Sequence, residues 1–340
     1  MVVSRSKAPI RPATMFDVAA EAYVSQSTVS QVLRGTGRIH EDTAKRVREA
    51  VNELGYVYDP LAAKRRRKSS NVIGVVINDM SNPFFAEVMI GLEPPLTDAG
   101  HIMLMTHTGE DLARQEMALL MLREQHAAGI VLCPALGTPA SLTATVKSWG
   151  IPMVVMVRSL GAGSYDFAGS DHAQGVQLAT EHLIAQGHRR IGFLGGQPSP
   201  MLEERLRGYQ AALDHAHIAF NETLIFTANP TRDGGHEAMK ALLTVHPPVK
   251  AAVCYNDLAA CGALSALKER ELHAGTDFAL MGYDNVLPVA HTILPLSTVD
   301  VCPRELGEHT ASILLARIDD PNCTARRFLT SPRLVLRRSG

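Results

Sequence analysis

The run from Ser25 to Leu33 combines an apolar face with a face of short hydroxyl and amide side chains. Ser25 is a natural N-cap, and Val29 and Leu33 recur at the spacing of a helix. The remaining face carries Gln26, Ser27, Thr28, Ser30 and Gln31. Such side chains can hydrogen-bond both base edges and phosphates in a major groove. The run therefore indicates a helix that docks on DNA.

A second chemically distinct feature is the run of five cations from Lys64 to Lys68, within residues 59–70. Mutual repulsion predicts that this segment is poorly ordered without DNA, whereas phosphates would relieve the repulsion and permit a short helix. Residues 1–70 hold 13 Lys/Arg against 7 Asp/Glu, and the other 270 residues hold 20 against 27. This asymmetry favours a polyanionic partner for the N-terminal end alone, although a merely solvated basic linker is the alternative.

Polar pairs follow three apolar runs farther along the chain. These pairs are Asn78-Asp79, Asn256-Asp257 and Asp284-Asn285. Open parallel sheets bind ligands outside the carboxyl ends of their strands, so these ends are candidates for a binding site. Helix capping is the common alternative for any one of them. Their occurrence at equivalent strand ends favours a ligand.

Three short helices are expected to position the DNA-docking face. Thr14 can cap the first helix, with Asp17 three residues later, and Phe16 lies among its apolar positions. The third helix would end at Gly55. A three-helix scaffold that binds a protein is the alternative, but the polar second helix and the positive charge favour DNA.

From Asn71 onward, strands and helices alternate, which predicts parallel sheets covered on both faces. Two such series imply two Rossmann-like lobes. The predicted organisation is an all-α headpiece at 12–58, a hinge at 59–70 and an α/β core at 71–339. The first lobe is expected to comprise about 71–165 plus 300–325. The second is expected to comprise about 166–298 plus a C-terminal strand.

The headpiece resembles that of the lac repressor/gal repressor family. The matching pattern is D-V-A-x-x-A-x-V-S-x-x-T-V-S-x-V-L, followed by T-x-x-R-V-x-x-A-x-x-x-L-G-Y. The resemblance implies a helix-turn-helix in which Gln26, Ser27 and Gln31 read bases. It further implies that Ser25, Thr28 and Ser30 contact phosphates. Gln31 stands where the family often has Arg, which predicts a shift from guanine toward adenine.

The same resemblance implies a hinge helix in the minor groove, formed by Ala62, Lys64, Arg65 and Arg66. Arg65 stands where many members carry a leucine that wedges between base pairs. Because arginine inserts favourably into a narrow A·T minor groove, we predict groove narrowing or phosphate contact rather than apolar intercalation.

The core resembles the periplasmic-binding-protein-like domain of that family. The matching signatures are N-D-x-x-N-P-F-F-A-E-x-x-x-G, G-H-R-R-I-G-F-L-G-G, E-R-L-R-G-Y, Y-N-D-L-A-A-x-G-A and M-G-Y-D-N. The resemblance implies an effector site of Arg205 as clamp, with Asn256 and Asp284 for hydroxyls and Phe84 and Phe85 as an apolar face. Asp79, Arg158 and Asp171 are further candidates. Within the family, GGQPS, AVCYND and P-R-E-L-G are similar to the maltose-regulon type of repressor.

Other functional classes find little support in the sequence. Nucleotide-binding, nucleophile-elbow and zinc-protease motifs are missing, and His215 and His217 have no third metal ligand nearby, so no enzyme activity, cofactor or metal is expected. The five cysteines form no CxxC pair, which favours a reducing compartment. The first fifteen residues lack an apolar run and no stretch could cross a bilayer, so a cytoplasmic location is expected.

These features together predict a transcriptional regulator that acts as a repressor and is controlled by a small molecule bound between the lobes. The family suggests a sugar or sugar derivative as the effector. A periplasmic transport receptor would not need the headpiece, and a structural nucleoid protein would not need a sensing core of 270 residues. The end VLRRSG carries no leucine-heptad extension, so a homodimer on a pseudo-palindromic operator is expected.

Overall fold

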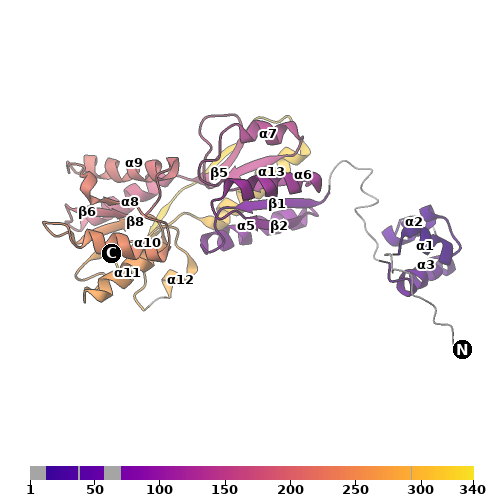
Figure 1. The fold of residues 1–340 in the computed structure, drawn as a ribbon, viewed down its shortest axis with the longest axis horizontal. Helices are drawn as coiled ribbons and strands as arrows, with labels where there is room; N and C mark the ends of the chain where they lie inside the picture. The colour runs from indigo at the N-terminus through magenta and orange to yellow at the C-terminus, as the bar shows by residue number, and fades with distance from the viewer. Residues whose placement is uncertain (1–12, 37–38, 57–69, 292) are drawn as a thin grey trace, which may run out of the picture. The chain divides into compact units, whose positions relative to one another are not determined.

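The computed structural model describes residues 13–36, 39–56, 70–291 and 293–340. The chain divides into two compact units, Met1–Ser70 and Asn71–Gly340. The first unit contains the headpiece and the second contains the core (Figure 1). The described helices include none that is long and apolar enough to cross a membrane.

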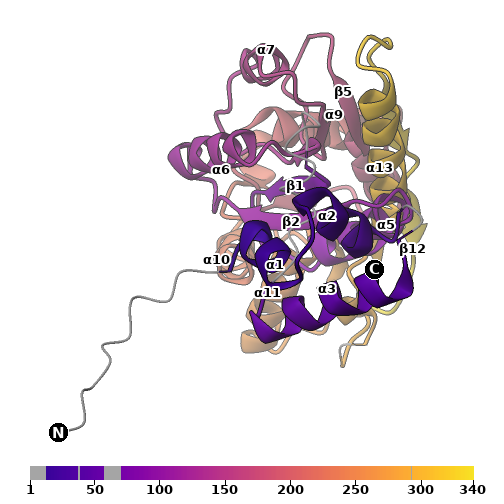
Figure 2. The same cartoon turned by 90° about the vertical axis from the view of Figure 1, so that its right-hand side faces the viewer.

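The headpiece consists of helices α1 (Met15–Glu21), α2 (Gln26–Arg34) and α3 (Glu41–Glu53), seen in indigo in Figure 2. Thr14 and Asp17 form the predicted capping box of α1, which fixes the start of this helix. Buried side chains from all three helices form the core, among them Val18, Val29 and Val47. Unlike the other two, α3 has no side-chain hydrogen bond at its N-cap, His40.

Phe16, which the sequence places among the apolar positions of the first helix, is 65% exposed. The buried stripe of α1 contains Met15, Val18, Ala19 and Ala22, at i, i+3, i+4 and i+7. Phe16 follows Met15 by one residue and therefore lies about 100° around the helix from the stripe.

The first lobe of the core contains a parallel sheet with the order β11-β5-β4-β3-β1-β2. Its strands are β1 (Val72–Ile77), β2 (Ile102–His107), β3 (Gly129–Leu132), β4 (Met153–Met156), β5 (Asp166–Ser170) and β11 (Arg327–Thr330). Helices α5 (Phe84–Asp98) and α13 (Pro303–Asp319) pack together, and α6 (Leu112–Glu124) and α7 (Leu142–Ser148) contribute to a second apolar cluster. Along β1, Val75 belongs to the larger cluster and Val76 to the second, as side-chain alternation requires.

The contact between α5 and α13 depends on glycine. A Cβ on Gly91 would lie 2.0 Å from the carbonyl oxygen of Arg304, and one on Gly307 would lie 2.2 Å from that of Val88. The two backbones therefore approach more closely than any side chain would allow.

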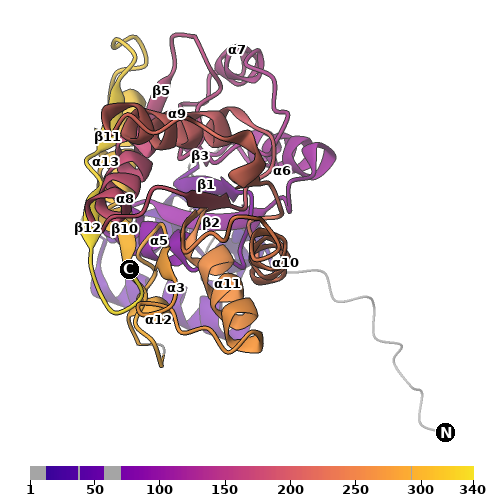
Figure 3. The same cartoon turned by 90° about the vertical axis from the view of Figure 1, so that its left-hand side faces the viewer.

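The second lobe, which is in front in Figure 3, contains a parallel sheet with the order β7-β6-β8-β9. Its strands are β6 (Ile191–Leu194), β7 (Ile225–Phe226), β8 (Ala251–Cys254) and β9 (Ala279–Met281), and β10 (Thr298–Asp300) pairs antiparallel with β12 (Arg333–Val335). The helices are α8 (His172–Ala185), α9 (Pro200–His215), α10 (Arg232–Leu242), α11 (Asp257–Glu269) and the short α12 (Leu287–Ala290). Helix α8 packs on α9, and α10 packs on α11.

The chain passes between the lobes three times, from β5 to α8, from β10 to α13 and from β11 to β12. These crossings are hydrogen-bonded to one another: Thr330 Oγ1 donates to the carbonyl of Val301 at 2.7 Å, and Asp171 N donates to that of Thr330 at 3.3 Å. The first lobe therefore extends to Ser170 and Thr330, five residues past each expected bound. The sequences of β5 (DFAGS) and β11 (RFLT) are short and partly polar, so they do not stand out as strands.

Candidate functional site

Helix α2 presents the predicted base-reading residues to solvent. Gln26, Ser27 and Gln31 are exposed, whereas Val29 on the opposite face is fully buried. Ser25 Oγ accepts from Thr28 N at 3.1 Å and lies 2.6 Å from Ser27 Oγ. The helix N-terminus thus carries a cluster of hydroxyls beside its positive dipole end, an arrangement that suits phosphate.

The predicted phosphate-contacting residues differ in exposure. Ser25 is exposed, and Thr28 and Ser30 are half-buried. The hinge residues Ala62, Lys64, Arg65 and Arg66 lie outside the described residues.

In the core, seven of the eight residues predicted to bind the effector line one cavity between the lobes, and Asp171 does not. The seven are Asp79, Phe84, Phe85, Arg158, Arg205, Asn256 and Asp284. The carboxyl ends of strands from both sheets meet here, as the strand-end rule predicts. The volume of this cavity, measured as the space open to the centres of water molecules, is about 60 Å³.

Arg205, on α9, is the most unusual side chain of the cavity because it is a cation with only 4% exposure. Its guanidinium lies between the rings of Tyr255 and Tyr283, with centroid distances of 4.1 and 4.0 Å. Nη1 donates to the carbonyl of Tyr255, while Nε has no hydrogen-bond partner among the described residues. A buried donor without a partner is costly, so a ligand acceptor at this position would be strongly favoured.

Asp284 supplies the complementary acceptor. It follows β9 with a φ of 110°, a conformation that non-glycine residues rarely adopt and that suggests a functional constraint. Asn82 Nδ2 of the first lobe donates to its Oδ2 at 3.4 Å, so the two lobes meet at this carboxyl group. Burial raises the pKa of Asp284 to about 6, and Arg205 and Asn82 act in the opposite direction.

Asn256 has a structural role that the sequence offered only as an alternative. Its Oδ1 caps α11 by accepting from Ala259 N at 2.8 Å, and its Nδ2 donates to the carbonyl of Pro230 at 3.0 Å. Asp171 likewise caps α8 by accepting from Gln174 N. Asn256 still lines the cavity, but these bonds leave it less hydrogen-bonding capacity for a ligand than the sequence suggested.

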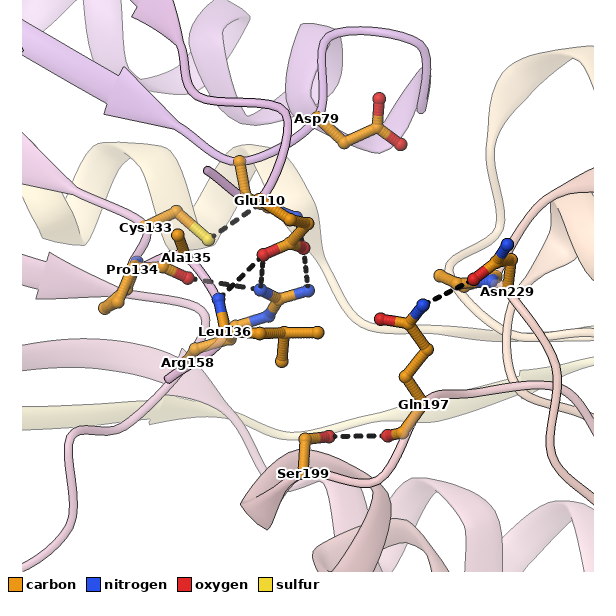
Figure 4. A network of polar contacts seen from close by, with 12 residues as sticks. Asp79, Glu110, Cys133, Pro134, Ala135, Leu136, Arg158, Gln197, Ser199 and Asn229 are labelled. Carbon is orange, nitrogen blue, oxygen red and sulfur yellow. Dashed lines mark hydrogen bonds and ion pairs between the residues drawn. The ribbon is translucent and has the colours of Figure 1, made fainter. Parts of the chain in front are cut away.

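Arg158 is held by its own lobe (Figure 4). Its Nη1 and Nη2 donate to the two carboxylate oxygens of Glu110 at 2.8 and 2.7 Å, and Nη1 also donates to the carbonyl of Pro134. Glu110 accepts further bonds from Leu136 N and Asn78 Nδ2, both at 2.8 Å. Burial alone would raise the pKa of Glu110, but the bonds and charge of Arg158 outweigh it and lower this pKa.

Several residues that line the cavity or contact its lining residues were missed from the sequence. Glu110 follows β2 and could have been found by the strand-end rule, had the interrupted run HIMLMTHTGE been followed to its end. Tyr255, Tyr283 and His172 gave no such signal, because their importance comes from packing around Arg205. Burial and the nearby Arg205 charge lower the pKa of His172 to about 3, so its ring is neutral.

Phe84 and Phe85 open α5 and form an edge-to-face pair with ring centroids 5.2 Å apart. They give the cavity an apolar wall opposite a donor, Arg205, and an acceptor, Asp284. Such a combination suits a ring that bears hydroxyl groups. The described residues contain no cluster of three or more His, Cys, Asp or Glu that could hold a metal ion.

Both units of the chain match families of known proteins. Residues 14–59 match the family described as "Bacterial regulatory proteins, lacI family". Residues 70–336 match "Periplasmic binding proteins and sugar binding domain of LacI family". The HTH-type transcriptional repressor PurR of Aliivibrio salmonicida is 34% identical, covering 96% of this chain and 98% of the relative. The maltose regulon regulatory protein MalI of Escherichia coli is 32% identical, covering 95% and 97%.

Solved structures show the same likeness. A complex of the transcriptional regulator CelR with cellobiose has a TM-score of 0.74 and 29% identity, covering 96% of this chain and all of that one. A lac repressor dimer bound to operator and the anti-inducer ONPF has a TM-score of 0.83, covering 97% and 99%. Its identity of 24% supports the fold alone. With both units matched along nearly the whole chain, the protein belongs to the LacI family of bacterial regulatory proteins.

Proposed function

We propose that this chain is a sequence-specific transcriptional repressor, dimeric on a pseudo-palindromic operator and controlled by a sugar or sugar derivative bound between the core lobes. The observation that carries the proposal is the interlobe cavity, which is lined by the Asp284 carboxyl group and by the buried Arg205 guanidinium, whose Nε has no partner among the described residues. The headpiece would bind the operator, because the polar face of α2 exposes Gln26, Ser27 and Gln31 and can enter a major groove. The cytoplasm, where the operator DNA resides, is the proposed location.

The proposed mechanism is linkage between the two sites. Effector closes the cleft and rotates one lobe against the other, which changes the separation of the two hinges in the dimer. DNA affinity then changes by the coupling free energy, typically about 1–3 kcal/mol in allosteric proteins. We propose that Ala62, Lys64, Arg65 and Arg66 carry this change to the minor groove.

The DNA-binding part of the proposal predicts a base-specific role for Gln31. Gln31→Ala is expected to lower affinity for operator by about 1–3 kcal/mol because bidentate pairing with adenine is lost. Gln31→Arg is expected to move the preference toward guanine. Selection of bound sequences from a random duplex library, followed by titration at several salt concentrations, measures both effects.

A matched control comes from the basic hinge. Lys64→Ala or Arg67→Ala is expected to weaken operator and random duplex alike and to reduce the salt dependence, because phosphate contacts carry no base information. Unchanged sequence preference in Gln31→Ala would contradict the proposed base contact.

The dimer is proposed from an exposed apolar surface on the first lobe. Edge strand β2 exposes Ile102 and Leu104 by more than half, and α6 exposes Met117 by 64% and Met121 by 57%. An exposed apolar edge strand is an aggregation hazard unless another chain covers it, and we propose that a second copy does so.

This proposal predicts that Met117→Glu/Met121→Glu yields monomers with much weaker operator binding. Leu329→Glu is the matched control, because Leu329 is 42% exposed on β11, the opposite edge strand of the same sheet. Sedimentation velocity over a concentration series gives the oligomeric state. A dimer that persists in the double variant would place the interface elsewhere.

A further inference from the structure

The three helices of the headpiece end in the same hydrogen-bonded turn. In each turn one residue has a positive φ, and the next residue donates its N–H to the carbonyl five residues earlier. These bonds run from Val24 to Ala19, from Thr36 to Gln31 and from Tyr56 to Val51, each at 3.0 Å. This is the Schellman motif, which favours glycine at the positive-φ position because left-handed backbone crowds a side chain.

Helix α1 differs from the other two in the residue at that position. Gly35 follows α2 with a φ of 65°, and Gly55 follows α3 with a φ of 60°. After α1 the position is occupied by Tyr23, with a φ of 55°. The Tyr23 side chain does not gain compensating burial, because this residue is 87% exposed.

The core shows that other side chains are tolerated in this conformation. His126, His217 and Glu271 follow α6, α9 and α11 with a positive φ and are exposed. The backbone of Tyr23 therefore does not by itself imply a function. What distinguishes Tyr23 from these polar residues is a large aromatic ring left in solvent, together with its place in the headpiece.

Tyr23 lies at the start of the helix that docks on DNA. It precedes Ser25, the N-cap of α2, by two residues. The Ser25 and Ser27 hydroxyls lie 2.6 Å apart at this end of the helix, and Gln26 is exposed beside them. Because successive phosphates follow one another closely along a strand, a duplex seated on this end would extend over the turn that carries Tyr23.

The chemistry of the Tyr23 side chain suits the DNA backbone. Tyrosine hydroxyls are among the donors that bind phosphate oxygens, and the flat ring can pack on a sugar. An exposed tyrosine would also suit a protein partner. The position favours DNA, since a duplex that contacts Ser25 and Gln26 would cover this ring as well.

We propose that Tyr23 is a further DNA-binding residue. Its hydroxyl donates to the backbone phosphate next to the one at the N-terminus of α2, and its ring packs on the adjoining deoxyribose. The contact fixes the register of α2 on the duplex and carries no base information. This inference rests on the proposed function and adds to it a contact from outside the recognition helix.

The test compares two variants of the full chain on random duplex and on duplex selected from the random library. Tyr23→Phe removes the hydroxyl alone, whereas Tyr23→Gly removes the side chain and gives the turn its preferred residue. Each is expected to weaken binding to both duplexes by at least about fivefold, because a hydrogen bond to phosphate is lost. The slope of log affinity against log salt should not change, since no cation is removed.

Ethylation interference locates the contact on the selected duplex. Both Tyr23 variants are expected to lose interference at one phosphate in each half-site and to keep the rest of the pattern. Hydrogen exchange of the α1 and α2 amides checks the fold, and in Tyr23→Gly it should be equal to or slower than in wild type, because glycine adopts a positive φ without crowding. His217→Gly makes the same replacement in the turn after α9 and is the matched control that should bind DNA as wild type does.

The outcomes separate this contact from the proposed function. If both Tyr23 variants bind selected duplex like wild type with the same interference pattern, Tyr23 does not contact DNA, and DNA binding by the headpiece stands. If Tyr23→Gly weakens binding but Tyr23→Phe does not, the phosphate hydrogen bond is overturned. If the wild-type chain prefers no duplex over another, the proposed function itself fails and the role of Tyr23 fails with it.

Discussion

Arg205→Ala is expected to abolish the effector-induced rise in unfolding temperature. A bound effector at about 100 times its dissociation constant should stabilise the wild-type core by roughly 2.7 kcal/mol. The variant loses the donor fork that lies between Tyr255 and Tyr283, including the buried Nε with no partner among the described residues. Thermal-shift screening of sugars and phosphosugars, with and without the substitution, measures the effect.

The control for this prediction is Arg207→Ala on the same helix. The Arg207 side chain is 66% exposed, so its removal should leave the ligand-induced shift unchanged. Because Arg205→Ala also leaves the Tyr255 carbonyl unpaired, its unliganded unfolding temperature should fall, and the quantity compared is the shift caused by ligand. A full shift in Arg205→Ala would show that this arginine does not bind the effector.

The second large effect concerns Asp257, which is fully buried behind the cavity. Burial, and then the neighbouring Asp284, raise its pKa to about 8, although Thr298 Oγ1 and Val286 N donate to its carboxylate. The folded chain therefore holds a proton that the unfolded chain releases near pH 4, so the free energy of unfolding should fall as pH rises from about 4 to 8. Asp284, whose pKa is raised to about 6, contributes a slope of the same sign over a narrower range.

Asp257→Asn should remove most of this slope and raise the free energy of unfolding at pH 8 by on the order of 2–5 kcal/mol. The amide keeps both contacts, since its oxygen can accept from Val286 N while its nitrogen donates to the Thr298 hydroxyl. Denaturant titrations between pH 4 and 8 measure the slope, and Asp214→Asn at an exposed position is the control. An unaltered slope in Asp257→Asn would assign the pH dependence to other groups.

Local sequence signals predicted the headpiece well, because its first two helices begin at side-chain caps. Thr14 and Ser25 cap helices as expected, and Gly55 adopts a positive φ of 60° just after α3. The strand-end rule also brought Asp79, Asn256 and Asp284 to one cavity, since parallel strands place their carboxyl ends at one edge of each sheet.

The features that sequence did not predict depend on tertiary packing. The role of Asn256 as a helix cap could not be separated from ligand binding, because the same amide suits both. The partner of Arg158 is Glu110, 48 residues away, and nothing local in the sequence joins them. Strand β5 was missed because Asp166 and Gly169 interrupt its apolar pattern, and its pairing with β4 is what places it in the first lobe.

Because Glu110 and Arg158 bond to each other within the first lobe, the two lobes differ in the hydrogen-bonding groups that they offer to a ligand. The hydrogen-bonding groups that the first lobe places at the cavity are largely paired within that lobe. In the second lobe, Arg205 and Asp284 keep hydrogen-bonding capacity for a ligand. Substitutions around α9 and the loop after β9 can therefore retune which metabolite is recognised without disturbing the lobe that continues into the hinge. Such separation would let the same fold evolve to recognise new effectors while it continues to bind the same operator.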